Sequence, residues 1–472
     1  MSKSFLGQST LYAMASVAPI LVNLAVTPFV TRMLGAHDYG LVAISISLFQ
    51  FGIVVFTLGL AASITRQAII AATGAAGAVA TVLIGAGCAV VLFLLALMLL
   101  PVWGPLILPH ADVGLLVYPL ISCLGLAFLQ NAQSLFRAEQ RVIAFVSMSA
   151  AASILAPLTG MALLLLVQRS PGVYVAGLAI AHLAVGVLAV IRCVGLARPK
   201  FVRGDFWTNL QIGLPTVPHQ IAASFLTLIL VALTSHSSGL VGAGALQIGV
   251  LMGSAPLLLL GAFNNAWAPL IYRSSDDRRE DVLSTTYRGF MLLTVFLVLG
   301  FAVLAPLVVP LVAGPIAAAM PVTQVALIVA LGSPFMTSYL ANIHLVFLSG
   351  RTAALALTTP FAAGAATAIA ALPSLLGAPP DIRVLALALP LFQVFQWVIG
   401  VKLRRARSAH RIPIVELMPE FIVITCALAV SYFAGYRLEI AVIVAFVLSI
   451  GLFCYRYKLI LRYVNRRRLK VA

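Results

Sequence analysis

Two arginine side chains, Arg32 and Arg66, each end a long apolar stretch of the sequence. A guanidinium group is planar and always charged, and it can hold phosphate oxygens through two parallel hydrogen bonds. We therefore take Arg32 and Arg66 as candidate phosphate-binding residues. The alternative is structural: Arg66 would anchor a helix end at a membrane surface, and Arg32 would extend toward water.

Neutral polar side chains also occur within apolar stretches, where each one requires a hydrogen-bonding partner. Amide and imidazole groups suit the binding of sugar hydroxyls, and a histidine can also titrate or donate to a phosphate. Hydrogen bonds between neighbouring helices are the alternative for each of them. The candidates are Asn23, His219, Gln220, Asn264, Asn265, Asn342 and His344.

The five cysteines do not indicate a metal or redox site. Cys88, Cys123, Cys193, Cys426 and Cys454 lie far apart, and no pair has the spacing of metal ligands. We expect them to behave as small hydrophobic residues. The sequence offers no catalytic residues, so we expect a protein that is not an enzyme and that needs no cofactor or metal.

Composition determines which elements must position these residues. Of the 472 residues, 62% are hydrophobic and 9% are charged, and the mean hydropathy is +1.12. Soluble domains carry roughly 25% charged residues. These values exclude soluble, disordered, collagen-like and disulfide-stapled classes, and predict an all-α polytopic membrane protein.

Apolar runs of about 20 residues, the length that crosses a bilayer, recur along the chain and predict fourteen spans. With both termini inside, 25 of the 29 Lys and Arg residues lie on the inner side, as the positive-inside rule requires. The net charge of +17 therefore indicates cytoplasmic loops and an anionic lipid surface, and not nucleic acid. The spans lie near 9–32, 40–63, 77–100, 113–136, 142–167, 172–194, 209–233, 240–263, 284–312, 321–348, 353–376, 383–401, 417–434 and 438–455.

Polar segments divide the spans into blocks of six, six and two. We expect an N-terminal six-helix lobe over 1–203, a second lobe over 204–405, a helix pair over 406–455 and a basic cytoplasmic tail over 456–472. The two lobes begin alike: each has prolines in its first span and a glycine-bearing turn before its second, at Gly35 and Gly239. Repeated halves are typical of transporters that bind substrate between them, so we expect the lobes to surround a central cavity.

None of the twelve acidic residues is predicted to lie in the middle of a span. An exporter of cationic drugs would normally carry a carboxylate at membrane depth, to pair with the cation and to take up a coupling proton. This distribution argues against drug antiport and predicts a membrane interior whose fixed charges are cationic.

The residues that begin each half resemble a known family. The first 70 residues and the later motifs are similar to bacterial polysaccharide-transport (Wzx-type oligosaccharide) flippases, of the multidrug/oligosaccharidyl-lipid/polysaccharide exporter superfamily. The resemblance implies two six-helix lobes that alternate in access, and a lipid-linked sugar moved to the outer leaflet. It rests on Pro28, Thr31-Arg32, Leu34-Gly35, Asp38-Tyr39-Gly40, Leu58-Gly59, Arg66, Gly213-Leu214-Pro215, Ala268-Pro269 and Tyr272-Arg273.

We therefore expect a flippase for a polyprenyl-diphosphate-linked oligosaccharide, such as an O-antigen, capsule or exopolysaccharide unit, in a bacterial cytoplasmic membrane. The expected partners are this lipid-linked oligosaccharide and membrane lipids, with a polysaccharide polymerase and glycosyltransferases as further candidates. Two alternatives stay open: a drug or small-molecule exporter of the same superfamily, and a membrane-embedded glycan polymerase or ligase. No connecting segment is long enough for the extramembrane domain that the latter usually needs.

Overall fold

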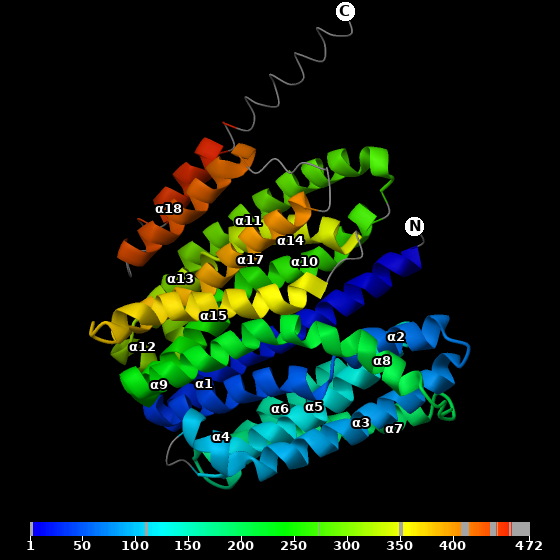
Figure 1. The fold of residues 1–472 in the computed structure, drawn as a ribbon. Coiled ribbons are helices and arrows are strands. Elements are labelled where there is room, and N and C mark those ends of the chain that lie inside the picture. Colours follow the sequence, from blue (N-terminus) through cyan, green and yellow to red (C-terminus); the bar gives the residue numbers. More distant parts are fainter. Residues whose placement is uncertain are drawn as a thin grey trace, which may run out of the picture. The chain divides into compact units, whose positions relative to one another are not determined.

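The computed structural model describes residues 3–108, 112–272, 274–348, 353–406, 415–434, 440, 442–452 and 455. Side chains are described from Leu21 onward within these ranges, except at positions 265, 266, 269, 353 and 415. The described residues form helices and short connections without any strand, as Figure 1 shows. The predicted all-α class is therefore confirmed.

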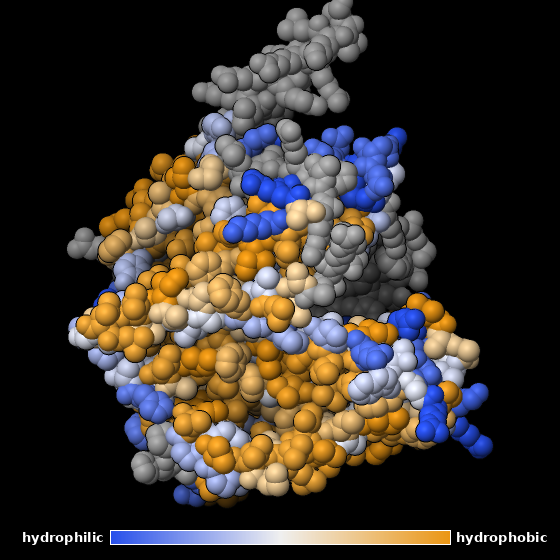
Figure 2. All heavy atoms as spheres, viewed as in Figure 1, coloured by the Kyte–Doolittle hydropathy of each residue, from blue (hydrophilic) through white to orange (hydrophobic). Residues whose placement is uncertain are grey.

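Ten stretches of the described chain are long and apolar enough to cross a membrane. Two of them, Leu21–Ile70 and Asp205–Asn264, have 50 and 60 residues, well beyond the roughly 20 residues of one crossing. Shorter apolar helices lie at Met418–Ala434 and Val442–Leu452. Figure 2 shows hydrophobic side chains over the visible helix faces and hydrophilic ones gathered toward helix ends. The protein is a multi-pass membrane protein, and the count of fourteen spans stays a prediction.

The chain forms two compact units, and each contains more than one segment of the sequence. Unit 1 comprises Met1–Ile248, Val312–Pro321 and Thr352–Ala388, and unit 2 comprises Gly249–Leu311, Val322–Arg351 and Leu389–Ala472. The lobe boundaries at 203/204 and 405/406 stay predictions from the polar segments.

Unit 1 is a bundle of helices that come from three segments of the chain. It contains α1 (Lys3–Phe56), α2 (Leu60–Ile70), α3 (Gly74–Met98), α4 (Leu100–Ile107), α5 (Gly114–Ala138), α6 (Val142–Leu166), α7 (Pro171–Val194), α8 (Asp205–Gly213), most of α9 (Val217–Gly253), α12 (Pro315–Ala319), α15 (Ala353–Leu375) and α16 (Ile382–Ala386).

Two glycines bend the longest helices of unit 1. Gly35 in α1 has φ 81° and ψ 175°, and Gly239 in α9 has φ 73° and ψ −179°. Positive φ values are open to glycine and strained for other residues. These nearly identical backbone angles occur at the two positions that the sequence marked as corresponding turns of the two halves. Each long helix therefore contains two segments joined at a glycine.

Small residues bring the two bends of unit 1 into direct backbone contact. A Cβ atom on Gly40 would lie 2.0 Å from the carbonyl oxygen of Leu240, a distance that no side chain tolerates. Gly244 also approaches Gly40. Because glycine has no Cβ, the second segments of α1 and α9 can pack at this distance.

The core of unit 1 lies among α2, α3, α5, α6 and α7. Close contacts between Gly125 and Gly186, and between Gly160 and Gly177, hold α7 against α5 and α6. Around these contacts, large side chains such as Leu60, Ile64, Leu135 and Phe136 are fully buried. A membrane offers little hydrophobic drive between helices, so this close packing supplies the attraction.

Prolines interrupt the first span of the second half, as the sequence predicted. Helix α8 ends at Gly213, a 3₁₀ turn covers Leu214–Thr216, and α9 begins at Val217. Pro215 and Pro218 lack the N–H groups that a continuous α-helix requires. The hydroxyl of Thr216 donates to the Gly213 carbonyl at 2.7 Å and satisfies one of the groups left open.

Unit 2 contains α10 (Ala255–Tyr272), most of α11 (Asp276–Ala313), α13 (Val322–Ala330), α14 (Ser333–Leu348), most of α17 (Ala388–Arg405) and α18 (Met418–Ala434). Its core joins α10, α11 and α14, where Trp267, Tyr287 and Leu345 are buried together. Figure 1 shows α14 and α17 running beside each other. The C-terminal ends of α10, α14 and α17 carry the polar residues described next.

Candidate functional site

His344 is the centre of a hydrogen-bonded chain of polar side chains in unit 2. Its Nδ1 lies 2.9 Å from the hydroxyl of Tyr272, and its Nε2 lies 2.9 Å from Oδ1 of Asn264. The amide oxygen can only accept, so Nε2 carries the proton, and Nδ1 of the neutral ring accepts from the tyrosine hydroxyl. The sequence identified Asn264 and His344 as candidates, and the structure joins them directly.

Aromatic rings fix the orientation of this imidazole. Trp267 contacts the edge of His344 at a centroid distance of 5.3 Å, and Tyr272 contacts it at 5.4 Å. The indole N–H of Trp267 donates to Thr286 on α11 at 2.8 Å. Because His344 is only 3% exposed, its position is determined by protein contacts and not by water.

The chain of polar groups reaches an open cavity through Tyr272. A cavity of about 380 Å³ is lined by Tyr272, Phe347 and Leu348 among the described residues. Both apolar side chains belong to the last turn of α14 and are exposed. The cavity therefore places a polar hydroxyl, connected to His344 and Asn264, beside apolar walls.

Asn342 lies two residues before His344 and contacts a different partner. Its amide donates to the carbonyl of Ser338 at 2.7 Å, and its Oδ1 accepts from Nε of Arg404 at 2.8 Å. The side chain of Arg404 is 7% exposed, and Glu280 on α11 lies within electrostatic range. A buried guanidinium thus supports the same helix, α14, that carries His344.

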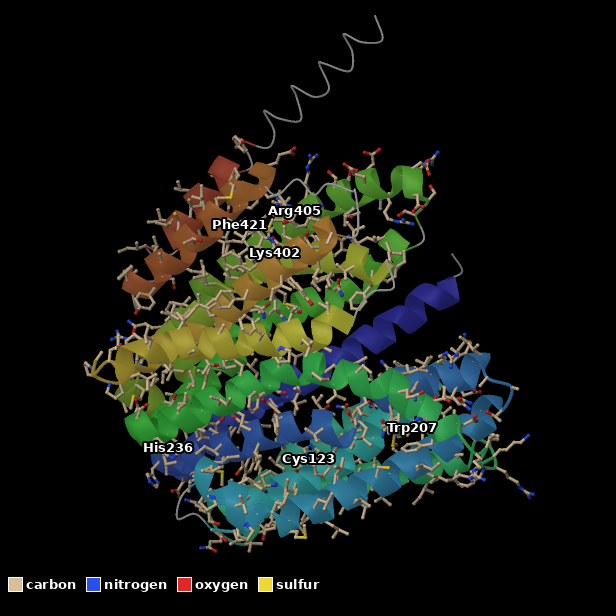
Figure 3. All side chains as sticks on the ribbon, viewed as in Figure 1. Cys123, Trp207, His236, Lys402, Arg405 and Phe421 are labelled. Carbon is tan, nitrogen blue, oxygen red and sulfur yellow. The ribbon has the colours of Figure 1, made fainter. Side chains whose placement is uncertain are left out.

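Arg404 is a functional candidate that the sequence does not single out. Its neighbours Lys402 and Arg405 are exposed, and Figure 3 labels both near the end of α17. Phe392, Gly400 and Arg404 are buried at spacings of eight and four residues, which is one face of a helix. The packing of α17 decides this burial, and the sequence alone does not distinguish Arg404 from Lys402 or Arg405.

Glu420 qualifies the expectation of an interior free of carboxylates. It lies in the first turn of α18 and is 1% exposed, whereas the other described acidic residues are at least partly exposed. It lies close enough to Tyr287 to interact with it electrostatically. The hydroxyl of Tyr287 also bonds to that of Ser338 at 2.8 Å. Glu420 therefore belongs to a buried polar group on α11, α14 and α18.

Arg32 and Arg66 belong to unit 1, and both are exposed. Nη1 of Arg32 donates to the carbonyl of Pro28 at 2.8 Å, one turn earlier in α1. The α1 segment that follows the bend at Gly35 ends at Phe56, and it extends about 30 Å at about 1.5 Å per residue. The two arginines lie at opposite ends of this segment, so one phosphate group cannot bind both at once.

The remaining candidates of unit 1 have local partners. Nδ1 of His219 lies 2.8 Å from the Thr359 hydroxyl on α15, which is a helix-to-helix hydrogen bond. The Gln220 amide donates to the Thr216 hydroxyl at 2.8 Å. Asn23 is exposed, and its backbone carbonyl accepts from Thr27 at 2.6 Å. Their roles in binding stay predictions. The side chain of Asn265 lies outside the described residues.

The sequence profile of a family described as "Polysaccharide biosynthesis protein" matches residues 6–275 of this chain. No curated protein matches the chain in sequence. The fold is similar to that of several solved membrane transporters.

The lipid II flippase MurJ, in an inward closed conformation, superposes with a TM-score of 0.70 and 14% identity, over 97% of this chain and 100% of that chain. A multidrug resistance MATE family transporter of the MOP superfamily, inward-facing, gives a TM-score of 0.60 and 15% identity, over 84% and 94%. A MOP superfamily transporter from Pyrococcus furiosus gives 0.54 and 15%, over 84% and 95%.

At these identities the solved structures show a shared fold, and the profile shows the family. The chain shares its fold with solved MOP superfamily transporters. Because the profile covers more than half of its residues, the chain belongs to the polysaccharide biosynthesis protein family.

Proposed function

We propose that this protein moves a polyprenyl-diphosphate-linked oligosaccharide across the cytoplasmic membrane by alternating access. The observation that carries the proposal is the cavity at Tyr272, where a polar chain through His344 and Asn264 adjoins the apolar side chains of Phe347 and Leu348. A lipid-linked sugar has the same division into a polar head and an apolar tail. Family membership and the fold shared with a lipid II flippase support this class of cargo.

The basic residues are proposed to act in sequence along the transport path. Arg66 and Arg32 end successive predicted spans, and in the predicted topology Arg66 faces the cytoplasm and Arg32 faces outward. Their separation by a whole helix segment suits two successive phosphate contacts, one before and one after translocation. Cargo must bind the intermediate states as well, because a ligand that stabilises one state only would trap the transporter.

The proposal assigns no covalent step to the protein, which acts as a transporter and not as a polymerase or ligase. Movement of the head group requires only hydrogen bonds, charge pairing and a conformational change that closes the transporter to the cytoplasm and opens it to the outside. In this proposal both termini lie in the cytoplasm, and the glycosyltransferases and polymerase of the same glycan pathway are its partners on either side.

The test is transport by the purified full-length chain in proteoliposomes that contain a fluorescent polyprenyl-diphosphate disaccharide. A membrane-impermeant quencher reports how fast the labelled head group changes leaflet. We expect wild-type vesicles to move it faster than protein-free vesicles. Tyr272→Phe removes only the hydroxyl that contacts His344 and should slow movement, whereas the matched variant Tyr118→Phe on α5 should not.

Three results contradict the proposal. Wild-type vesicles that move the lipid no faster than empty ones exclude flipping of this cargo. Uptake of a cationic dye by the same vesicles, without movement of the lipid, favours the drug or small-molecule exporter instead. Growth of the glycan chain without any leaflet change favours a polymerase.

A further inference from the structure

A second cavity lies in unit 1, at the end of the bundle where both long helices bend. It has a volume of about 490 Å³, within the roughly 300–1,000 Å³ of small-molecule sites. Figure 3 labels His236 at this end and Trp207 at the opposite end. We call this cavity the bend pocket. Its lining residues are His37, Leu41, Leu108, Asp112, Leu115, Ser170, Pro171, Gly172, Ser235, His236 and Leu240.

Four connections far apart in sequence form the bend pocket. They are the bend of α1 near Gly35, the end of α4 with the start of α5, the start of α7, and the bend of α9 near Gly239. In the predicted topology these are the four outside-facing connections that follow spans 1, 3, 5 and 7. The pocket is therefore built by the fold and is not a gap beside a single loop.

The polar groups of the bend pocket are arranged to bind hydroxyls. Nδ1 of His236 lies 2.8 Å from the Ala232 carbonyl, which can only accept, so in the neutral ring Nε2 is an acceptor. Nδ1 of His37 lies 3.0 Å from the Asp38 carboxylate and is held in the same way. Ser170 and Ser235 add hydroxyls to this lining.

The charge around the start of α7 disfavours an anion. A helix N-terminus normally attracts negative charge. Here Oδ2 of Asp112 lies 3.7 Å from the position that a Cβ atom on Gly172 would occupy, and the Ser170 hydroxyl accepts from the Val173 amide at 3.4 Å. The carboxylate already balances the helix dipole, so a phosphate group would be repelled.

A metal ion does not fit either. Among the described residues, no three His, Cys, Asp or Glu side chains are close enough together to hold one. The remaining walls are aliphatic, from Leu41, Leu115, Leu240 and Pro171. Polar groups that bind hydroxyls beside apolar walls match a sugar ring, which has hydroxyls at its rim and C–H groups on its faces.

We propose that the bend pocket binds a neutral sugar ring of the transported oligosaccharide. The inference rests on the proposed function, because it takes the cargo to be a glycan, and it assigns the sugar to a pocket that shares no lining residue with the cavity at Tyr272. Imidazole Nε2 atoms and the Asp112 carboxylate accept from the sugar hydroxyls, and the leucines contact its apolar face. The diphosphate has no partner in this pocket.

The test measures binding of free sugars, without lipid, to the purified full-length protein in detergent by saturation-transfer NMR. The probes are neutral disaccharides of glucose, galactose, mannose, rhamnose and N-acetylglucosamine, with inorganic phosphate and Zn²⁺ as competitors. Gly172→Phe fills the pocket, since a Cβ there meets only Asp112 at an ordinary distance. The matched control is Gly87→Phe on α3, where a Cβ meets nothing within 4 Å.

At least one disaccharide should bind the wild type, and Gly172→Phe should weaken that binding by about tenfold or more. Gly87→Phe should bind like the wild type. His236→Phe keeps a planar aromatic side chain but removes the Nε2 acceptor, so it should weaken sugar binding. This variant provides a test even if Gly172→Phe folds poorly. Phosphate and Zn²⁺ should not compete.

Each contrary result is decisive. The bend-pocket proposal is overturned if no disaccharide binds the wild type. It is also overturned if the Gly172→Phe and His236→Phe variants bind as tightly as the wild type, or if phosphate or Zn²⁺ displaces the sugar. If one of these results is obtained but wild-type vesicles still flip the lipid-linked sugar, only the bend-pocket proposal fails, and the proposed function is retained. If the sugar binds in the pocket but wild-type vesicles do not flip the lipid, the bend-pocket proposal is retained and the proposed function fails.

Discussion

At the scale of single residues, the buried side chain of Arg404 shows how a charge is accommodated in unit 2. Its Nε donates to Asn342, whose own amide donates to the backbone of α14. Losing one partner leaves the other buried and unsatisfied, which costs more than the bond itself contributes. Arg404 therefore stabilises the helix that positions His344.

Replacing Arg404 by Met should lower the free energy of unfolding by about 1–3 kcal/mol, because Oδ1 of Asn342 loses its donor. Arg405→Met alters the exposed neighbour and should change stability little. Chemical unfolding of the detergent-solubilised protein measures both variants. In the double variant Arg404→Met/Asn342→Leu, part of the loss should be recovered; additive losses would show that the two side chains act independently.

Arg32 offers a test of phosphate binding at a single exposed position. Arg32 is exposed at the end of a predicted span, and its guanidinium donates to the Pro28 carbonyl one turn earlier in α1, so its removal should leave insertion of the protein intact. Arg32→Ala should reduce surface polysaccharide in cells that depend on this protein, while the amount in the membrane stays unchanged. Full export by this variant would remove Arg32 from the mechanism.

Asp381 gives a pH dependence outside the membrane spans. Hydrogen bonds from Arg383 hold the pKa of Asp381 below its usual value of 3.8. The carboxylate also caps α16 by accepting from the Arg383 amide at 2.8 Å. A lowered folded-state pKa contributes stability that is present above the unfolded-state pKa and lost as pH falls through the folded-state pKa.

Asp381→Asn should therefore be less stable than the wild type near neutral pH, and the difference should shrink as pH falls below about 4. Thermal unfolding across that pH range measures it. The pair is partly exposed to solvent, which screens the charges, so the difference should be small. A difference that stays constant with pH would show that the charge of Asp381 contributes nothing.

At the scale of elements, the bends at Gly35 and Gly239 decide where α1 and α9 change direction. Alanine at either position would have to adopt a positive φ with ψ near 180°, a conformation that is essentially restricted to glycine and costs roughly 1–3 kcal/mol. Gly35→Ala and Gly239→Ala should each lower stability by about this amount, whereas Gly87→Ala should not, because Gly87 lies within the regular helix α3 with open space around it. Thermal unfolding of the three variants tests this; equal stability would mean that the bends relax without cost.

The interruptions of these helices were predictable from the sequence, whereas the contact between their bends was not. Proline and glycine act on the backbone of their own segment, so the interruption at Pro215 and the turns at Gly35 and Gly239 follow from residue type. The direct contact between Gly40 and Leu240 joins residues 200 positions apart. Nothing local in the chain specifies that contact.

At the scale of the whole molecule, the distribution of Lys and Arg predicts which connections face the cytoplasm. Single cysteines introduced into a cysteine-free background at Asp112 and Ser275 test this prediction, since both positions are exposed. A membrane-impermeant thiol reagent applied to intact cells should label Asp112→Cys and leave Ser275→Cys unlabelled. Reversed labelling would invert the orientation, and labelling of both would change the number of spans.

The sequence alone determined the membrane class, the helical fold, the family resemblance and the polar residues that needed partners. These follow from composition and from signals within about 20 residues, the length of one crossing. It could not determine that His344 lies between Tyr272 and Asn264, or that Arg404 faces inward to Asn342 while Arg405 does not. Those partners lie 62 to 80 residues apart. Only the packing of whole helices decides such pairings, because the rotation of each helix depends on every residue along its buried face.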